Sequence, residues 1–247
     1  MENKLIKEHI ARIFIESKGI YGAPKIHEII KKEKLLEKPP SLKRVQRLMK
    51  NLGLFAKTIK KFKPKKSRAC DLELPNYLKG DFKAFKINTK WVADITYIHT
   101  IKDGWCYLAS VMDLCSHKIV GYSFSKSIDK SIVIKALKKA LTNQGNPKNV
   151  IIHTDRGSQY LSKDYINLVE SSDCIRSYSA KGNPYDNACI ESFHAILKKE
   201  EVYRKVYLTF EEANTELFKF IEGWYNRKRI HSSIEYLTPQ EFEILAA

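Results

Sequence analysis

The chain has no long apolar run and no secretion signal. Nowhere in its 247 residues does an apolar stretch approach the roughly 20 residues that cross a bilayer. Met1 is followed by Glu2 and a mixed-charge helical pattern, which is unlike a signal peptide. These absences argue against a membrane protein and predict a cytoplasmic one.

Cysteine is sparse and unpaired in pattern. The five cysteines are an odd number, scattered along the chain as Cys70, Cys106, Cys115, Cys174 and Cys189. None forms a C-x-x-C pair or lies near a His pair at zinc spacing, which excludes a zinc-binding N-terminal module. We expect reduced thiols in the core or on the surface, because no local motif would activate a cysteine as a nucleophile.

Positive charge is plentiful and unevenly placed. Residues 1–90 hold 24 Lys and Arg against 9 Asp and Glu, a net charge of +15. Residues 91–247 hold 20 against 19, a net charge of +1. A basic module joined to a nearly neutral one predicts one part that binds a polyanion, most often nucleic acid, and a second part with a different function.

The N-terminal residues have the pattern of a helix-turn-helix unit. Apolar side chains recur at helical spacing over residues 5–14 and 26–30, and again over 45–52 after the helix-capping Ser41. The third helix would present four basic residues outward, namely Lys43, Arg44, Arg47 and Lys50. These are candidate DNA contacts, the alternative being a solvated basic face.

A strongly basic run follows this helical segment. Seven cations occupy the twelve positions 57–68 around Pro64, a composition that cannot pack as a core. The run is either a solvated linker or an arm that follows phosphates, and the neighbouring basic helix favours phosphate contact. Its candidate contacts are Lys60, Lys61, Lys63, Lys65 and Lys66.

From Trp91 onward the pattern becomes that of an α/β domain. Strands are expected near 91–99, 104–112, 118–125, 150–153 and 175–179, with helices after the third, fourth and fifth. This order predicts a ribonuclease-H-like mixed five-stranded sheet with flanking helices. We therefore expect a helix-turn-helix-like segment at 1–56, a basic linker at 57–86 and a larger domain with C-terminal helices at 87–247.

Three carboxylates stand where the chemistry is expected. Asp94 lies inside a strand-like run, Asp155 follows a buried strand, and Glu191 lies on a helical stretch, with 35 residues between it and Asp155. Each has an ordinary alternative as an outward strand residue, a turn aspartate or a solvent-facing glutamate. A pair of Mg²⁺ or Mn²⁺ ions would bring all three together, because these hard cations take oxygen ligands and can clamp both sides of a phosphoryl displacement.

The surroundings of these carboxylates resemble the catalytic core of insertion-sequence transposases related to retroviral integrases. The resemblance rests on Trp91-x-x-Asp94-Ile95-Thr96-Tyr97, His153-Thr154-Asp155-x-Gly157-Ser158-Gln159-Tyr160, Gly182-Asn183-Pro184-Tyr185-Asp186-Asn187-Ala188 before Glu191, and Tyr225-Asn226-x-x-Arg229-x-His231. Tyr21-Gly22 and the Val45–Met49 segment are similar to the family's helix-turn-helix. The resemblance covers nearly the whole chain.

The resemblance implies roles for particular residues. Asp94, Asp155 and Glu191 would bind the metal ions and carry catalysis, and Lys198, two helical turns beyond Glu191, would contact the DNA end. His153, Ser158 and Asn183 would either orient the ligands or make ordinary turn and strand-end hydrogen bonds. Asp186 would begin the Glu191 helix as an N-terminal acid.

The family also implies partners and rival functions. DNA partners would be the terminal inverted repeats and the target, bound by a homo-multimer. The chain resembles a second reading frame, whose active form often includes an upstream frame, so a non-catalytic regulator of transposition is the alternative. A ribonuclease or junction nuclease on the same fold is a third possibility. Relatives often read Leu-Gly where this chain has Ile234-Glu235, a departure expected to affect packing.

Overall fold

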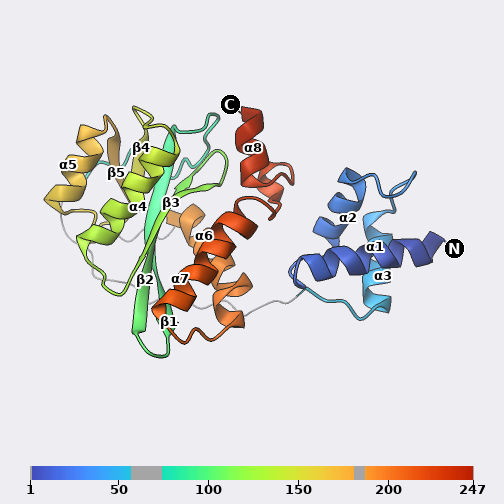
Figure 1. Cartoon of the computed structure of the whole chain (residues 1–247). Helices are drawn as coiled ribbons and strands as arrows, with labels where there is room; N and C mark the ends of the chain where they lie inside the picture. The colour runs from blue at the N-terminus through green and yellow to red at the C-terminus, as the bar shows by residue number, and fades with distance from the viewer. Residues whose placement is uncertain (1, 57–73, 181–186, 247) are drawn as a thin grey trace. The chain divides into compact units, whose positions relative to one another are not determined.

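The computed structural model describes residues 2–56, 74–180 and 187–246 and divides the chain into two compact units, 1–62 and 63–247. Figure 1 shows the elements of each unit. Some residues discussed above lie outside the described residues, namely Lys60, Lys61, Lys63, Lys65, Lys66, Cys70 and residues 182–186 of the motif that contains Asn183 and Asp186.

The first unit consists of three helices, α1 (Glu2–Glu16), α2 (Ala23–Lys32) and α3 (Leu42–Asn51). Pro24 lies in the first turn of α2, where its missing N–H costs no hydrogen bond. The Ser41 hydroxyl caps α3 by accepting from the Arg44 N–H at 3.3 Å. Most of the apolar positions predicted from helical spacing form the core of this unit: Ile6, Ile10, Ile13, Ile26, Ile30, Val45, Leu48 and Met49. Leu5 and Leu52, at the outer ends of the predicted faces, are exposed instead.

The second unit contains a five-stranded sheet. Its strands are β1 (Lys90–Thr100), β2 (Gly104–Asp113), β3 (Ile119–Ser125), β4 (Ile151–Thr154) and β5 (Ile175–Tyr178). The helices are α4 (Lys130–Asn143), α5 (Lys163–Ser171), α6 (Ala188–Glu200), α7 (Phe210–Phe218) and α8 (Pro239–Ala246), with short helical turns η2 (Val202–Arg204), η3 (Lys219–Tyr225) and η4 (Ser232–Ile234). The predicted order of elements is confirmed.

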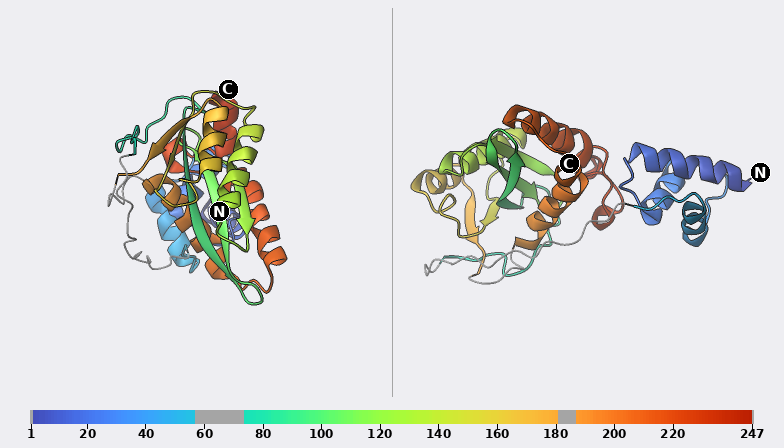
Figure 2. Two further views of the ribbon diagram at one scale, coloured as in Figure 1. Left: turned by 90° about the vertical axis from the view of Figure 1, so that its left-hand side faces the viewer. Right: turned by 90° about the horizontal axis from the view of Figure 1, so that it is seen from below.

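The strand order is β3-β2-β1-β4-β5, which makes the sheet mixed as predicted. β1 pairs antiparallel with β2 and parallel with β4, and β4 pairs parallel with β5. Helices α4 and α5 cover one face and α6 and α7 the other, as the right-hand view of Figure 2 shows. Alternate residues of β1 therefore enter different cores, with Trp91 and Ala93 toward α4 and Val92 and Ile98 toward α6.

Strand β3, at one edge of the sheet, is held by close contacts. Gly121 on β3 lies so near α4 that a Cβ atom there would be 2.4 Å from the Ala136 carbonyl oxygen, so only glycine fits. At the free edge of β3, the side-chain amide of Asn226 accepts from the Ile119 N–H and donates to the Ile119 carbonyl, both at 3.0 Å. A side chain far along the chain thus extends the hydrogen bonding of β3.

Residues just before β1 also pack on the sheet. The Pro75 carbonyl accepts from the Tyr178 N–H at 2.8 Å, and Leu78 is buried in the core beneath α6 and α7. Lys90 donates to the Asp81 carboxylate at 3.0 Å. The described residues of the expected linker thus contact the larger unit, whereas 57–73 lie outside the described part of the chain.

The C-terminal region is tied to α6 by a buried ion pair. The guanidinium of Arg229 donates to both oxygens of Glu200, at 2.9 Å from Nε and 2.9 Å from Nη2, and each residue is 8% exposed. The Trp224 indole N–H donates to the same carboxylate at 3.2 Å. Glu235 adopts a φ of 56°, in the left-handed region that favours glycine, so the Leu-Gly that the family resemblance leads one to expect at 234–235 would suit this backbone better.

Candidate active site where strand β4 ends

The parallel register of β1 and β4 brings two of the predicted carboxylates to neighbouring positions. The last aligned pair is Ala93 with Thr154, and Asp94 and Asp155 are the next residues on their strands. Asp94 lies on the face that Val92 shares with α6, because side chains alternate along a strand. β1 is also the strand at which the sheet changes from antiparallel to parallel pairing, a common place for a site.

Each oxygen of the Asp94 carboxylate has a polar neighbour. Oδ1 accepts from the Ile95 N–H at 2.8 Å, and Oδ2 lies 3.5 Å from Nδ1 of His194 on α6. The Asp94 side chain is 20% exposed and that of His194 is 8% exposed. The carboxylate thus stands at the boundary between sheet, helix and solvent.

Asp155 lies at the start of the loop that follows β4. Its Oδ1 accepts from the Gly157 N–H at 2.9 Å, and among the described residues its Oδ2 accepts no hydrogen bond. The residue opens to solvent, yet the protein atoms crowded around the carboxyl group and the negative charge of Asp94 raise its pKa to about 6. Two carboxylates that repel each other in this way favour a cation between them.

Glu191 lies in the first turn of α6 and is exposed. Partial desolvation of its carboxyl group by nearby protein atoms, and then the charge of Asp94, raise its pKa, while His194 acts in the opposite direction. Asp94 also acts on Lys198. Burial lowers the pKa of Lys198, and the charge of Asp94 acts in the opposite direction. Glu191, His194 and Lys198 therefore share the face of α6 that looks toward Asp94, as the spacing of three and seven residues requires.

Asp113 differs from these carboxylates because both of its oxygens accept several hydrogen bonds. Asp113 is 1% exposed, and its two oxygens accept from three backbone N–H groups, one hydroxyl and the Trp91 indole. Desolvation still raises its pKa. Asp113 is a structural residue that organises the turn after β2, whereas Asp94 and Asp155 keep oxygen lone pairs available for a ligand.

The loop after β4 is shaped around Asp155. A Cβ atom at Gly157 would lie 2.9 Å from Oδ1 of Asp155, so this glycine permits the close approach of backbone and carboxylate. His153, fully buried just before, contacts the hydroxyls of Ser177 at 2.8 Å and Ser179 at 3.2 Å. These bonds tie the ends of β4 and β5 together beside the site.

Within residues 2–56, 74–180 and 187–246, no group of three His, Cys, Asp or Glu side chains is close enough to hold a metal ion. The candidate metal ligands in this arrangement are therefore Asp94 and Asp155, with Glu191 on the face of α6 that looks toward Asp94. Four cysteines are free thiols, and three of them, Cys106, Cys115 and Cys174, are buried.

Three family models match the chain. An HTH-like domain matches residues 1–62, and two integrase core domain models match residues 86–184 and 173–239. The transposase for insertion sequence element IS904 from Lactococcus lactis subsp. lactis is 38% identical over 98% of this chain and 95% of that protein. Transposase InsF for insertion sequence IS3A from Escherichia coli is 40% identical over 93% of this chain and 79% of that protein.

The chain belongs to the insertion-sequence transposases. It is a DNA transposase, an enzyme that cleaves and transfers DNA strands, and the predicted identity and function are confirmed. As a transposase with an HTH-like domain, it binds DNA. None of the described helices is long and apolar enough to cross a membrane.

Solved structures confirm the predicted fold of this transposase. The HTLV-2 integrase catalytic core domain, in its trimeric form with magnesium, matches with a TM-score of 0.50 and 19% identity over 65% of this chain and 99% of that one. The simian T-cell lymphotropic virus intasome, in complex with the PP2A regulatory subunit B56 gamma, matches with a TM-score of 0.52 and 17% identity. That match covers 90% of this chain and 74% of the other. Both likenesses concern the fold.

The candidate DNA contacts of the transposase differ in their surroundings. Lys43, Arg47 and Lys50 are exposed on α3. Arg44 instead turns to α1, where it donates to the Glu2 carboxylate at 2.9 Å and the Asn3 side chain at 2.8 Å. Lys198 is half-buried on α6, on the face of Glu191.

Sequence reasoning missed His194. Its position three residues after Glu191 on a helix was a usable signal, because residues at that spacing share a helical face. A lone histidine among Phe193 and Leu197 gave no reason to choose it, and its contact with Asp94 depends on how α6 packs on β1.

Proposed function

We propose that this transposase performs metal-dependent DNA strand cleavage and strand transfer with Asp94, Asp155 and Glu191. The observation that carries the proposal is the parallel register, which makes Asp94 and Asp155 neighbours at the end of β4. The pKa values of Asp155 and Glu191 are both raised in part by the charge of Asp94, which indicates three carboxylates within electrostatic reach.

The donor chemistry fits a hard divalent cation. Asp94 and Asp155 supply carboxylate oxygens, and Oδ2 of Asp155 has no competing hydrogen bond in the described part of the chain. Such oxygens suit Mg²⁺ or Mn²⁺, and Glu191 would complete the set, with two ions as the proposed number. The bound cations would supply Lewis acidity at the attacking and leaving oxygens.

The proposed chemistry has two displacements at phosphorus. In the first, the oxygen of water bonds to phosphorus and the 3′ oxygen leaves, which gives a 3′ hydroxyl and a 5′ phosphate. In the second, that 3′ hydroxyl attacks a target phosphodiester and displaces a 3′ oxygen of the target. Lys198, on the same face of α6 as Glu191, would hold a phosphate of the DNA end.

The partners of this reaction are likewise proposed. The terminal inverted repeats and the target DNA would be bound by a homo-multimer, because paired ends need paired reaction centres. The segment at 1–56 would bind DNA through Lys43, Arg47 and Lys50 of α3, and residues 57–86 would join it to the core at 87–247. The product of an upstream reading frame would be a further partner in recognising the ends.

The test is a strand cleavage and transfer assay on labelled duplexes carrying the inverted repeats that flank the reading frame, with Mn²⁺ or Mg²⁺. We expect 3′-end products that disappear with a chelator and in Glu191→Gln. DNA binding should be nearly unchanged, because Gln keeps the size of the side chain. Glu170→Gln, on exposed α5, is the matched control and should cleave normally. An active Glu191→Gln variant would contradict the assignment, and tight binding without products would favour the regulator.

A further inference from the structure

His194 has no role in the proposal above, yet it is the side chain that contacts Asp94 from α6. Its Nδ1 lies 3.5 Å from Oδ2 of Asp94, and it is 6% exposed as a whole residue. Its other ring nitrogen, Nε2, is buried and has no hydrogen-bond partner among the described residues. A buried imidazole with one nitrogen on a candidate metal ligand and the other unpartnered calls for an explanation.

We propose that His194 is a positioning residue that fixes the orientation of the Asp94 carboxylate through an Nδ1–H donated to Oδ2. The inference rests on the proposed function, because it gives His194 a task in the same site. Asp94 is then held at both oxygens, by the Ile95 N–H on Oδ1 and by His194 on Oδ2. A carboxylate held in this way presents its remaining lone pairs in one direction.

The tautomer follows from the surroundings of the ring. A neutral imidazole carries its proton on one nitrogen and leaves the other as an acceptor. A proton on Nε2 would leave a buried N–H without an acceptor in the described part of the chain, and would turn a bare Nδ1 toward a carboxylate oxygen. Both consequences are unfavourable, so the proton belongs on Nδ1.

Helix α6 determines how precisely this contact is made. Phe193 and Leu197 are buried in the core against β1, which sets the rotation of the helix. Glu191 and His194 then face the sheet together, one turn apart. His194 therefore links the helix that carries Glu191 to the strand that carries Asp94, and its loss would loosen Asp94 without changing the ligand set.

Three substitutions separate the two ring nitrogens. The Asn amide places an N–H donor near the position of Nδ1, the Gln amide places one near Nε2, and Phe fills the volume with no donor. We expect His194→Asn to lose less than about 10-fold in cleavage rate, and His194→Gln and His194→Phe to lose roughly 10- to 100-fold, as for other partners of metal-binding side chains. Thermal unfolding would show that each variant is folded.

A second measurement needs neither metal nor DNA. In the full chain labelled with ¹⁵N-histidine and freed of metal by a chelator, two-bond ¹H–¹⁵N correlations should show His194 with its proton on Nδ1. The signal is assigned by its loss in His194→Phe, and Asp94→Asn should disturb it. His99→Phe is the control, because it removes an exposed imidazole from β1, the strand that carries Asp94. It should leave the His194 signal and the cleavage rate unchanged.

The outcomes are distinct. A proton on Nε2, or a folded His194→Phe variant that cleaves at the normal rate, would overturn the inference. A wild-type chain that never cleaves with metal would defeat the proposed function, while the tautomer in the metal-free chain would still decide the role of His194.

Discussion

At the scale of single residues, the site is distinguished by what its carboxylates lack. Asp113 has donors on both oxygens and is structural, whereas Asp155 accepts one backbone hydrogen bond, from Gly157. The two aspartates are similarly placed next to strands, so composition alone does not separate them. The number of donors around each carboxylate separates a residue that holds a turn from one that awaits a cation.

The first residue-scale prediction concerns the pH dependence of stability in the metal-free chain. Asp155 has a pKa of about 6 when folded and about 3.9 when unfolded, so the folded state binds its proton more tightly. Its contribution to stability is then fully present below about pH 4 and is lost as pH rises through about 6. Asp155→Asn should therefore be more stable than the wild type at pH 7.5, by about 1 kcal/mol after allowance for solvent screening.

The measurement is urea unfolding of both proteins with a chelator at pH 4, 6 and 7.5. The Asn side chain keeps an acceptor for the Gly157 N–H, so the comparison isolates the charge. Added Mn²⁺ should stabilise the wild type and leave Asp155→Asn nearly unchanged. Equal stability of the two proteins at every pH would show that Asp155 ionises normally.

At the scale of elements, helix α6 is positioned at both ends. Its first turns contact β1 through His194, and its last residue, Glu200, is fixed by Arg229. The Arg229 guanidinium also lies 3.3 Å from the ring of His231, so the motif at 225–231 acts on α6. This explains structurally why the closing motif, far from the carboxylates in sequence, belongs to the same unit.

The element-scale prediction is that the two ends of this ion pair are strongly coupled. Arg229→Leu should destabilise the second unit by about 3–5 kcal/mol, because it leaves the Glu200 charge buried without its partner. Adding Glu200→Leu should recover a large part of that loss, since no charge then remains unpaired. Denaturant unfolding of the two single variants and the double variant gives the coupling energy.

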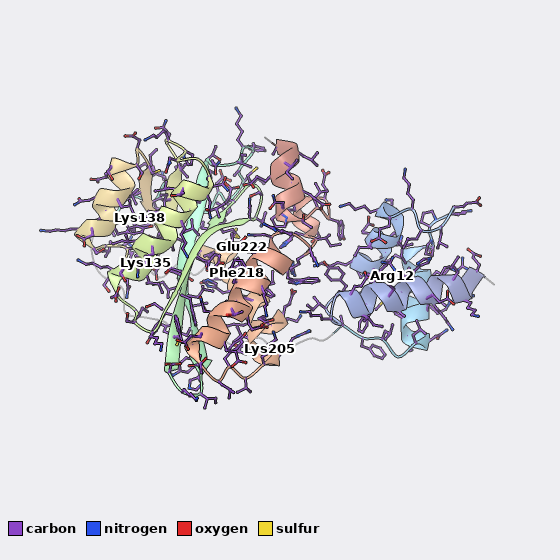
Figure 3. The ribbon with its side chains drawn as sticks, in the orientation of Figure 1. Arg12, Lys135, Lys138, Lys205, Phe218 and Glu222 are labelled. Carbon is purple, nitrogen blue, oxygen red and sulfur yellow. The ribbon has the colours of Figure 1, made fainter. Side chains whose placement is uncertain are left out.

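The control for this cycle is Lys205→Met. Lys205 pairs with Glu201 and Glu216 in the same unit but is 38% exposed, so its loss should cost less than about 1 kcal/mol. Figure 3 shows its side chain among the surface residues of this unit. Independent, additive losses from Arg229→Leu and Glu200→Leu would show that the buried pair carries no specific coupling.

At the scale of the whole molecule, charge and chemistry are divided between two units. Residues 1–62 hold 16 Lys and Arg against 6 Asp and Glu, a net charge of +10, and residues 63–247 hold 28 against 22, a net charge of +6. The three candidate catalytic carboxylates all lie in the second unit, which is about three times as long. The density of positive charge, and with it the attraction to the DNA backbone, is therefore higher in the first unit than in the unit that carries the carboxylates, whose own negative charges would repel phosphates.

The whole-molecule prediction concerns the salt dependence of binding to duplex DNA. Binding weakens as salt rises, and each phosphate contact adds about 0.9 to the steepness of log K, the DNA association constant, plotted against log salt concentration. Replacing Lys43, Arg47 and Lys50 of α3 together by Gln should therefore reduce the steepness of this slope by about 2–3. Arg44 is left in place because it pairs with Glu2. Fluorescence anisotropy over a series of KCl concentrations measures the slope.

The matched control makes the same charge change elsewhere. Lys135, Lys138 and Lys139 are exposed on α4, and the first two are labelled in Figure 3. Replacing these three by Gln should change the slope by less than about 1, because they lie on the helix that covers the other face of the sheet from α6. Equal losses in the two triple variants would mean that total charge, and not α3, governs binding.

The sequence by itself determined the elements and supplied the three candidate carboxylates. Strand alternation and helical spacing are local properties, so the order of strands and helices could be predicted, as could the core of α1–α3. Asp94, Asp155 and Glu191 were selected from local motifs and from resemblance. The departure at Glu235 was also visible, but its positive φ was not.

Only the tertiary structure decided which residues meet. The contact of His194 with Asp94 joins residues 100 positions apart. The pairing of Glu200 with Arg229 joins residues 29 positions apart, and the bond between Asn226 and Ile119 of β3 joins residues 107 positions apart. Such contacts depend on strand register and on the rotation of α6, which are set by the packing of the whole core. Periodicity fixes the face on which a side chain lies, and packing fixes what that face touches.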